Sequence, residues 1–220
     1  MILLNRKCLI RHSLIVFCFA AVAMFLSIFY FDLPIALFFN RPELETIYYY
    51  SREITNIGYS IHYFALALAG LIFSKLFYPR INYFKKRIAA NQILQIHQWS
   101  IFSIKALVLL GVSVHPLKLI IGRQRPHASE NFYPLNFDSF NLNPHWHSLP
   151  SGHAQVLFTV ATLALLIWPR KKYLFLFLAI ILTLTRVTIH QHYFSDVIAG
   201  GILGYLGTLW LYYLWPPKIY

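Results

Sequence analysis

The sequence predicts an all-α integral membrane protein, a bundle of six transmembrane helices. Three observations lead to this fold class. Hydrophobic residues make up 58% of the 220 positions and charged residues only 12%, whereas soluble domains usually carry about 25% charged residues. Long apolar runs recur along the chain, and the basic and acidic residues between them fall into alternating connections. Because a helix satisfies its own backbone hydrogen bonds in lipid, we expect residues 1–220 to form a single membrane domain.

Six apolar runs give the predicted helices, since a spanning helix needs about 20 predominantly apolar residues. The first, Ser13–Phe31, is longer than the roughly 7–15-residue core of a secretory signal, so we interpret it as an uncleaved helix. The other five runs are Gly58–Tyr78, Trp99–Gly122, Ser151–Trp168, Tyr173–His190 and Phe194–Trp215. In the last run, Gly200 and Gly204 form a small-xxx-small pair, which predicts close approach of a neighbouring helix.

The charged residues between these runs predict the orientation. The basic segments contain Arg6, Lys7 and Arg11; Arg80, Lys85, Lys86 and Arg87; Arg170, Lys171 and Lys172; and Lys218. If six helices alternate in direction, all these segments fall on one side of the membrane and all seven acidic residues on the other. Basic connections stay cytoplasmic. We therefore expect a multi-pass protein of the bacterial inner membrane, with both termini in the cytoplasm and the Arg123–Leu149 loop outside.

The net charge of +12 does not indicate nucleic-acid binding. The basic residues lie between long apolar runs and do not form one stripe with interleaved polar surface. The expected partner is therefore a membrane lipid and not a nucleic acid.

Three short clusters carry the chemistry. They are Lys118 with Arg125-Pro126, then Pro150 through His153, then Arg186 with His192 and Asp196. In the predicted topology all three lie at the outer membrane face. Lys118 and Arg125 are two helical turns apart, so they face the same way if the third helix continues past Gly122.

These residue types suit a phosphate. Arg125 and Arg186 can grip its oxygens in bidentate fashion, while Lys118 acts as a point charge. Ser151-Gly152 at the start of a helix offers backbone N–H groups and the positive end of the helix dipole. We expect Pro150 at the first position of that helix.

The two histidines divide the remaining work. One must attack phosphorus as a neutral imidazole, and the other must protonate the leaving oxygen. His192 and Asp196 are four residues apart, which places them on one helical face and makes His192 the expected nucleophile, oriented by the carboxylate. His153, at the start of the phosphate-binding helix, is then the expected general acid.

The clusters resemble the three-part signature of the type 2 phosphatidic acid phosphatase superfamily. That signature reads Lys-x6-Arg-Pro, Pro-Ser-Gly-His and Ser-Arg-x5-His-x3-Asp, and the chain follows it in order over residues 118–196, with Thr185 in place of the serine. The resemblance implies a six-helix membrane enzyme that removes phosphate from lipid phosphates or diphosphates without a metal, through a phosphohistidine. Some members are soluble, but the apolar composition of this chain favours the lipid branch. Carried over by position, the catalytic residues are His192, His153 and Asp196, and the phosphate-binding residues are Lys118, Arg125, Ser151, Gly152 and Arg186.

Several alternatives remain open from the sequence. If the acceptor were a second lipid, the same site would be a lipid-to-lipid phosphotransferase. A non-catalytic lipid-binding or transport protein is the main rival from another class. Against it, the sequence indicates no buried ion pathway apart from Lys105 in the third predicted helix, and no half-to-half repeat. A zinc site among the neighbouring histidines is disfavoured because acidic and cysteine ligands are few, so we expect no metal and no cofactor. Undecaprenyl diphosphate, phosphatidylglycerol phosphate, phosphatidic acid and lipid A phosphates all remain candidate substrates.

Overall fold

The computed structural model describes residues 5–83 and 87–218, leaving out the side chains of residues 79–89. Its described helices are α1 (Arg6–Leu26), α2 (Asp32–Phe39), α3 (Glu45–Ile54), α4 (Ser60–Tyr83), α5 (Arg87–Ile121), α6 (Gly152–Ile167), α7 (Lys172–Thr188) and α8 (Phe194–Leu214). Extended pairing in the described residues is confined to an isolated bridge between Arg123 and Phe137. The all-α prediction is confirmed.

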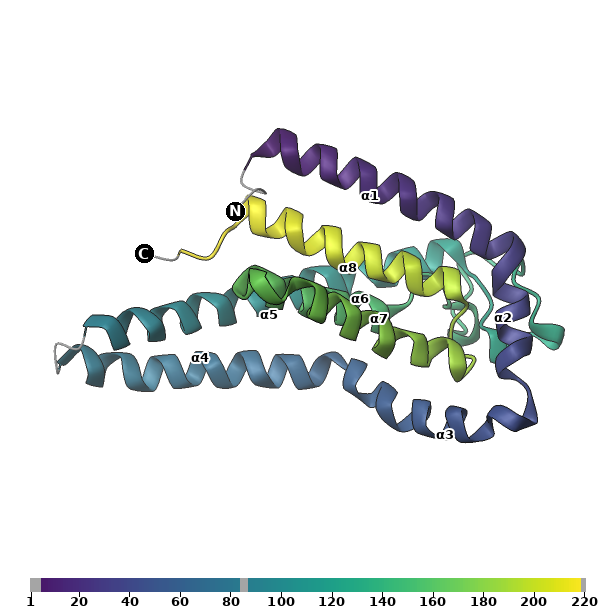
Figure 1. Cartoon of the computed structure of the whole chain (residues 1–220), viewed down its shortest axis with the longest axis horizontal. Coiled ribbons are helices and arrows are strands. Elements are labelled where there is room, and N and C mark those ends of the chain that lie inside the picture. Colours follow the sequence, from purple (N-terminus) through teal and green to yellow (C-terminus); the bar gives the residue numbers. More distant parts are fainter. Residues whose placement is uncertain (1–4, 84–86, 219–220) are drawn as a thin grey trace.

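The six predicted spans correspond to α1 and to α4 through α8. By length and composition, four helical stretches can cross a membrane, namely Arg6–Phe39, Pro42–Tyr78, Ala90–Ile121 and Phe194–Leu214. The remaining two spans are the shorter helices α6 and α7. The six long helices run along the molecule in Figure 1, and both chain ends lie at the end opposite to α2.

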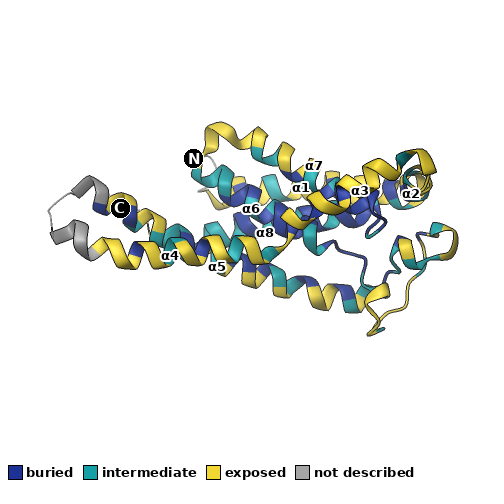
Figure 2. Cartoon of the chain, turned by 90° about the horizontal axis from the view of Figure 1, so that it is seen from below, coloured by how far each residue is buried: buried dark blue, intermediate teal, exposed yellow. Residues whose placement is uncertain are grey.

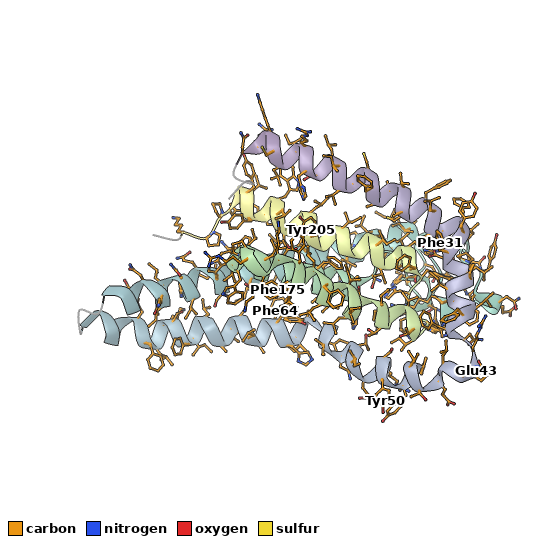
Figure 3. All side chains as sticks on the ribbon, in the orientation of Figure 1. Phe31, Glu43, Tyr50, Phe64, Phe175 and Tyr205 are labelled. Atoms are coloured by element: carbon orange, nitrogen blue, oxygen red, sulfur yellow. The ribbon has the colours of Figure 1, made fainter. Side chains whose placement is uncertain are left out.

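Two further helices, α2 and α3, were not predicted. A π-helical turn, Ser27–Phe31, joins α1 to α2, and α2 then turns across one end of the bundle (Figure 1). The next helix, α3, packs on α7 and leads through a 3-10 turn, Thr55–Gly58, into α4. In Figure 3, Tyr50 of α3 points away from the bundle, and 60% of its surface is exposed. These two helices therefore form a cap at the end of the bundle where α5 finishes and α6 begins.

Helix α6 is the centre of the bundle and packs against α5, α7 and α8. Its contact with α8 depends on glycine, as the sequence pair predicted. A Cβ added at Gly200 would lie 2.1 Å from the carbonyl oxygen of Ser151, and one added at Gly204 would lie 2.3 Å from that of Gln155. The two backbones are thus as close as residues without side chains allow.

The outer surface of the bundle is apolar. In Figure 2 the buried residues gather along α6 and α8, while α1, α4 and α5 show long exposed stretches. Large apolar side chains such as Phe19 (75% exposed) and Leu66 (72% exposed) face outward. A water-soluble protein rarely exposes so much contiguous apolar surface, whereas lipid tails cover it without cost. Lys105 is also exposed on α5, so its side chain is on the outside of the bundle and not among packed helices.

Candidate active site

The end of α5 brings Lys118 to the site, but not by the predicted route. Gly122 has a φ of 59°, and a Cβ there would lie 1.9 Å from the carbonyl oxygen of Asp138. The left-handed turn ends the helix, and Arg125 follows in extended conformation. The condition for Lys118 and Arg125 to share one helical face, a helix that continues past Gly122, is therefore not met.

The loop that includes Pro144–His147 holds both cations instead. Lys118 donates from Nζ to the carbonyl oxygen of His147 at 2.5 Å. Arg125 donates from Nε to the carbonyl oxygen of Pro144 at 3.1 Å and from Nη1 to the side-chain oxygen of Gln191 at 2.9 Å. Each cation is fixed by neutral acceptors, so its positive charge remains available to an anion.

Ser151 and Gly152 open α6 as a phosphate-binding helix start would require. Ser151 is the N-cap, and its side-chain oxygen accepts from the N–H of Ala154. Gly152 is the first helical residue, so Pro150 precedes the N-cap. The prediction that Pro150 occupies the first helical position is therefore wrong. The backbone N–H of Ser151 donates to the carbonyl oxygen of Asp196 at 3.0 Å. This bond ties the start of α6 to the start of α8.

His153 and Arg186 each retain a polar atom without a partner. The ring of His153 meets Tyr59 edge-on with 4.9 Å between centroids, and its Nε2 is buried with no hydrogen-bond partner among the described residues. Arg186, near the end of α7, donates from Nη1 to the hydroxyl of Thr55 at 3.3 Å, while its buried Nε lacks a partner in the same described ranges. Buried polar groups are normally satisfied, so both atoms point to a ligand.

His192 and Asp196 come together, although not on one helical face. Helix α8 begins at Phe194, and Asp196 accepts from the N–H of Tyr193 at 2.9 Å in a capping box. His192 therefore precedes the helix. Its Nδ1 lies 3.7 Å from Oδ2 of Asp196, which is too long for a direct hydrogen bond.

Ser148 lies between the two groups. Its hydroxyl donates to Oδ2 of Asp196 at 2.5 Å and stands 3.5 Å from Nδ1 of His192. Ser148 is fully buried. Because Nδ1 faces the hydroxyl and the carboxylate, Nε2 is the nitrogen of His192 that remains for chemistry.

The surroundings keep His192 neutral. It lies in the connection between α7 and α8, outside both helices. Burial lowers its pKa well below 6.5, and the charges of Lys118 and Arg125 lower it further, against the opposing effect of Asp196. A neutral imidazole is the form that acts as a nucleophile.

Arg123 is a site residue that the sequence analysis missed. Its side chain is completely buried and pairs with two carboxylates, Asp32 at 2.8 Å and Asp196 at 2.7 Å. Burial alone would lower its pKa, but the two carboxylates outweigh that effect and raise it. Two signals were available in the sequence: Arg123 is a second arginine close to Arg125, and Asp32 is a lone acid at the end of an apolar run. Both matter because charges at membrane depth indicate function. Nothing in the sequence indicated that Arg123 pairs with acids 91 and 73 positions away.

Two hollows adjoin the site. The first, here called the groove, lies between α4, α5 and α6, holds about 400 Å³ and ends at Lys118 and His153. Its walls are mostly apolar, and Val112 is 63% exposed, so the groove is open on the outer surface of the bundle. The second, here called the vestibule, holds about 390 Å³ and is lined largely by polar residues, among them Arg186 and Gln191. Tyr59 lines both. A larger apolar crevice, about 640 Å³ between α1, α5 and α8, contains none of the eight predicted site residues.

The histidines do not assemble a metal site in the described residues: no three His, Cys, Asp or Glu side chains gather as a ligand set there. The rings of His127 and His145 pack edge-to-face, with 5.4 Å between their centroids. Cations outnumber the one carboxylate among the charged side chains and histidines that line the two hollows. These groups are Lys118, His115 and His153 in the groove and Arg52, Glu53 and Arg186 in the vestibule.

Comparison with known proteins gives a consistent result. The model of the PAP2 superfamily matches residues 99–220. The chain is similar to a lipid A 1-phosphatase of Rhizobium etli, with 28% identity over 83% of this chain and 76% of that protein. A lipid A 1-phosphatase of Rhizobium johnstonii is 27% identical over 83% of this chain and 72% of its own. The bacitracin transport permease protein BcrC of Bacillus licheniformis is 26% identical over 51% of this chain and 57% of its own. No solved structure matches the chain.

Proposed function

The chain belongs to the PAP2 superfamily and is a lipid phosphatase, and on this premise we propose that it works without a metal, through a phosphohistidine on His192. The observation that carries the proposal is the convergence of three cations and two histidines around buried atoms that lack partners. His153 Nε2 and Arg186 Nε have no acceptor or donor in the described part of the chain. A phosphate ester supplies oxygens for both.

The phosphate is held by Lys118, Arg125 and Arg186, together with the N–H groups at the start of α6. His153 lies within electrostatic range of all three cations, which disfavour its protonated form, and the negative charge of a bound phosphate offsets that effect. Ser151 and Gly152 add the positive end of the helix dipole. The negative charge that develops in the transition state therefore faces fixed positive groups that need no reorganisation.

The reaction has two steps. In the first, Nε2 of His192 attacks phosphorus, the bond from phosphorus to the ester oxygen breaks, and His153 protonates the departing lipid oxygen. In the second, a water attacks the phosphohistidine, His153 accepts its proton, and the bond between nitrogen and phosphorus breaks to release inorganic phosphate. Asp196 stabilises the positive charge on the imidazole during both steps.

The lipid tail occupies the groove and the phosphate leaves through the vestibule. His153, the proton donor to the leaving group, lines the groove, whereas Arg186 and Gln191, which face the phosphate, line the vestibule. Apolar walls suit hydrocarbon and polar walls suit an anion and water. The lipid therefore enters the site on one side and the phosphate leaves it on another.

Lipid A 1-phosphate is the proposed substrate class, ahead of phosphatidic acid, phosphatidylglycerol phosphate and undecaprenyl diphosphate. The similarity to the two lipid A 1-phosphatases covers 83% of the chain, well beyond the matched residues 99–220. It therefore takes in part of the segment that forms α2, α3 and the wall of the groove. We place the site at the outer face of the bacterial inner membrane, with both termini cytoplasmic, on the charge distribution of the sequence.

Two other functions stay in view. The same phosphohistidine could pass its phosphate to a lipid hydroxyl, which would make the protein a lipid-to-lipid phosphotransferase. The similarity to a protein named as a transport permease keeps a transport or lipid-binding function as the second candidate. Phosphate transfer would give a phosphorylated lipid in place of free phosphate, and transport or lipid binding would give no chemical product.

The test is phosphate release from each of the four lipid phosphates in detergent with EDTA present. We expect release to survive EDTA, to be largest with lipid A 1-phosphate, and to disappear in His192→Ala. His62→Ala, which removes an exposed histidine on α4, serves as the matched control and should retain activity. Full activity of His192→Ala would exclude the proposed nucleophile, loss on chelation would indicate a metal, and phosphorylated lipid without free phosphate would indicate the transferase.

A further inference from the structure

A buried charge cluster connects the cap of the bundle to the nucleophile. It consists of Asp32 on α2, Arg123 after α5 and Asp196 on α8, and all three side chains have no exposed surface. Arg123 donates from Nη2 to Oδ2 of Asp32 at 2.8 Å and from Nη1 to Oδ1 of Asp196 at 2.7 Å. One guanidinium is therefore shared by two carboxylates.

The two oxygens of Asp196 have separate partners. Oδ1 faces Arg123, whereas Oδ2 accepts from Ser148 and is the oxygen near His192. The cluster carries two negative charges and one positive charge, so one negative charge remains beside the imidazole. Without Asp32, Arg123 would face Asp196 alone and would cancel that charge, because a contact in a dry interior is poorly screened.

Asp32 is held for this contact from two sides. The hydroxyl of Ser27 donates to its Oδ1 at 2.6 Å, and the N–H of Ser195 donates to the same oxygen at 3.0 Å. The hydroxyl of Ser195 lies 2.5 Å from Oδ2 of Asp32 and accepts from Arg123 at 2.6 Å. Asp32 lies outside the matched residues 99–220, so nothing in the family comparison assigns it a role.

We propose that Asp32 is a positioning residue of the catalytic reaction: by sharing Arg123 it keeps Asp196 negative toward His192. The proposal rests on the proposed function, in which His192 gains positive charge as it attacks phosphorus and Asp196 stabilises that charge. Asp32 touches neither the substrate nor His192. It acts on the rate of the chemical step and not on binding of the phosphate.

The first experiment compares Asp32→Asn with Ser27→Ala. Asp32→Asn removes the charge with almost no change of shape, whereas Ser27→Ala removes one hydrogen bond to the same carboxylate and leaves every charge in place. We expect kcat of Asp32→Asn on lipid phosphate to fall roughly 10- to 100-fold, the usual effect of losing an outer partner of a reacting group, with KM unchanged. Ser27→Ala should keep a kcat close to that of the wild type. Equal kcat in the two variants, or a change confined to KM, would overturn the proposal.

A double variant separates charge from structural support. Asp32→Asn/Arg123→Gln loses the ion pair and restores the net charge of −1 of the cluster wherever Asp196 stays ionised. We therefore compare kcat at a pH above the Asp196 titration of this variant, because Arg123 is the main group that favours the ionised form of this buried carboxylate. If Asp32 acts through charge, the double variant has a higher kcat than Asp32→Asn. If the cluster only anchors α2, the double variant is the more damaged of the two, and that result overturns the proposal even where single variants fold poorly. Thermal unfolding in detergent is measured for each variant. Absence of activity in the wild type would refute the proposed function itself, so the two failures are distinguishable.

Discussion

His153 Nε2 and Arg186 Nε are buried polar atoms without partners in the described ranges, and leaving them so costs free energy. An unsatisfied buried donor or acceptor costs about 1–3 kcal/mol. A bound phosphate ester removes that cost at both atoms. Hydrogen bonds to these two atoms therefore contribute to substrate binding, which favours a ligand with oxygens at both positions.

The neutral state of His192 leads to a prediction at this scale. Burial keeps the pKa of His192 well below 6.5, and protonation would abolish its nucleophilicity. Because the pKa of His192 is lowered, its neutral form persists to more acidic pH. The pH at which activity is lost through protonation of His192 is therefore lower than for an ordinary histidine. We expect kcat/KM, which reports the free enzyme, to show no loss from this group between about pH 7.5 and 6, where an ordinary histidine would protonate.

The substrate needs a separate control, since a phosphate monoester has its own ionisation near pH 6. A phosphorus NMR titration of the same lipid in the same micelles gives that ionisation directly. After correction for it, an acid limb centred at or above about pH 6.5 would contradict a lowered pKa.

The residues within each sequence cluster were predictable, and their long-range partners were not. Ser151, Gly152 and His153 are adjacent, and their place at a helix start follows from local capping rules. Ser148 and Arg123 depend on how the connection after α5 folds back on α8. Asp32 depends on a π-helical turn that no periodicity indicates. Local spacing therefore identifies the candidate reacting groups, whereas the groups that hold them come from tertiary packing.

At the scale of elements, the site is built on the contact between α6 and α8. Gly200 lies against the carbonyl of Ser151, so the starts of the two helices meet at Ser151 and Asp196. The same close approach continues at Gly204 one turn later. The distance between the start of α6 and the carboxylate of Asp196 is thus set by two glycines.

Gly204→Ala tests this contact. The added Cβ would lie 2.3 Å from the backbone oxygen of Gln155, which cannot move like a side chain, so the helices must separate. We expect a loss of about 1–3 kcal/mol, typical of overpacking, seen as a lower unfolding temperature in detergent. Gly111→Ala on α5 is the matched control, because a Cβ there meets nothing within 4 Å. An unfolding temperature for Gly204→Ala equal to that of Gly111→Ala would contradict the packing argument.

The spanning helices could be predicted because length and apolarity are sufficient signals for them. Helices α2 and α3 contain 8 and 10 residues, too few to span a bilayer. Their sequences also mix apolar and aromatic residues with charges, as in the segment that contains Tyr48, Tyr49 and Tyr50. Both helices pack on α7, and α2 also packs on α8; such tertiary support is not encoded in local composition.

At the scale of the whole molecule, charge and topology agree. Arg6 begins α1, Arg170 lies in the turn between α6 and α7, and Lys218 follows α8; these parts lie at the end that holds both termini, whereas Glu43 lies at the end formed by α2 and α3 (Figure 3). A bundle of this polarity has a defined orientation under the positive-inside rule. The whole site therefore faces one aqueous side.

A tag inserted between Ala128 and Asn143 tests that orientation. We expect it to react with a membrane-impermeant reagent added to intact cells, because this loop is on the site end of the bundle. A tag in the turn Pro169–Lys171, at the opposite end, should react only after the cells are permeabilised. The reverse pattern would show that the site faces the cytoplasm.

Because the groove opens on the apolar outer surface of the bundle, the proposed substrate reaches it from within the plane of the membrane. Withdrawing a chain from the bilayer costs roughly 0.8 kcal/mol for each methylene, so a dozen methylenes would add about 10 kcal/mol to the cost of binding. A tail that slides from the bilayer into the groove avoids this cost and never enters water. The rate then follows the mole fraction of the substrate within the membrane plane, and diluting the lipid with detergent slows the enzyme even when the amount of substrate per volume is constant.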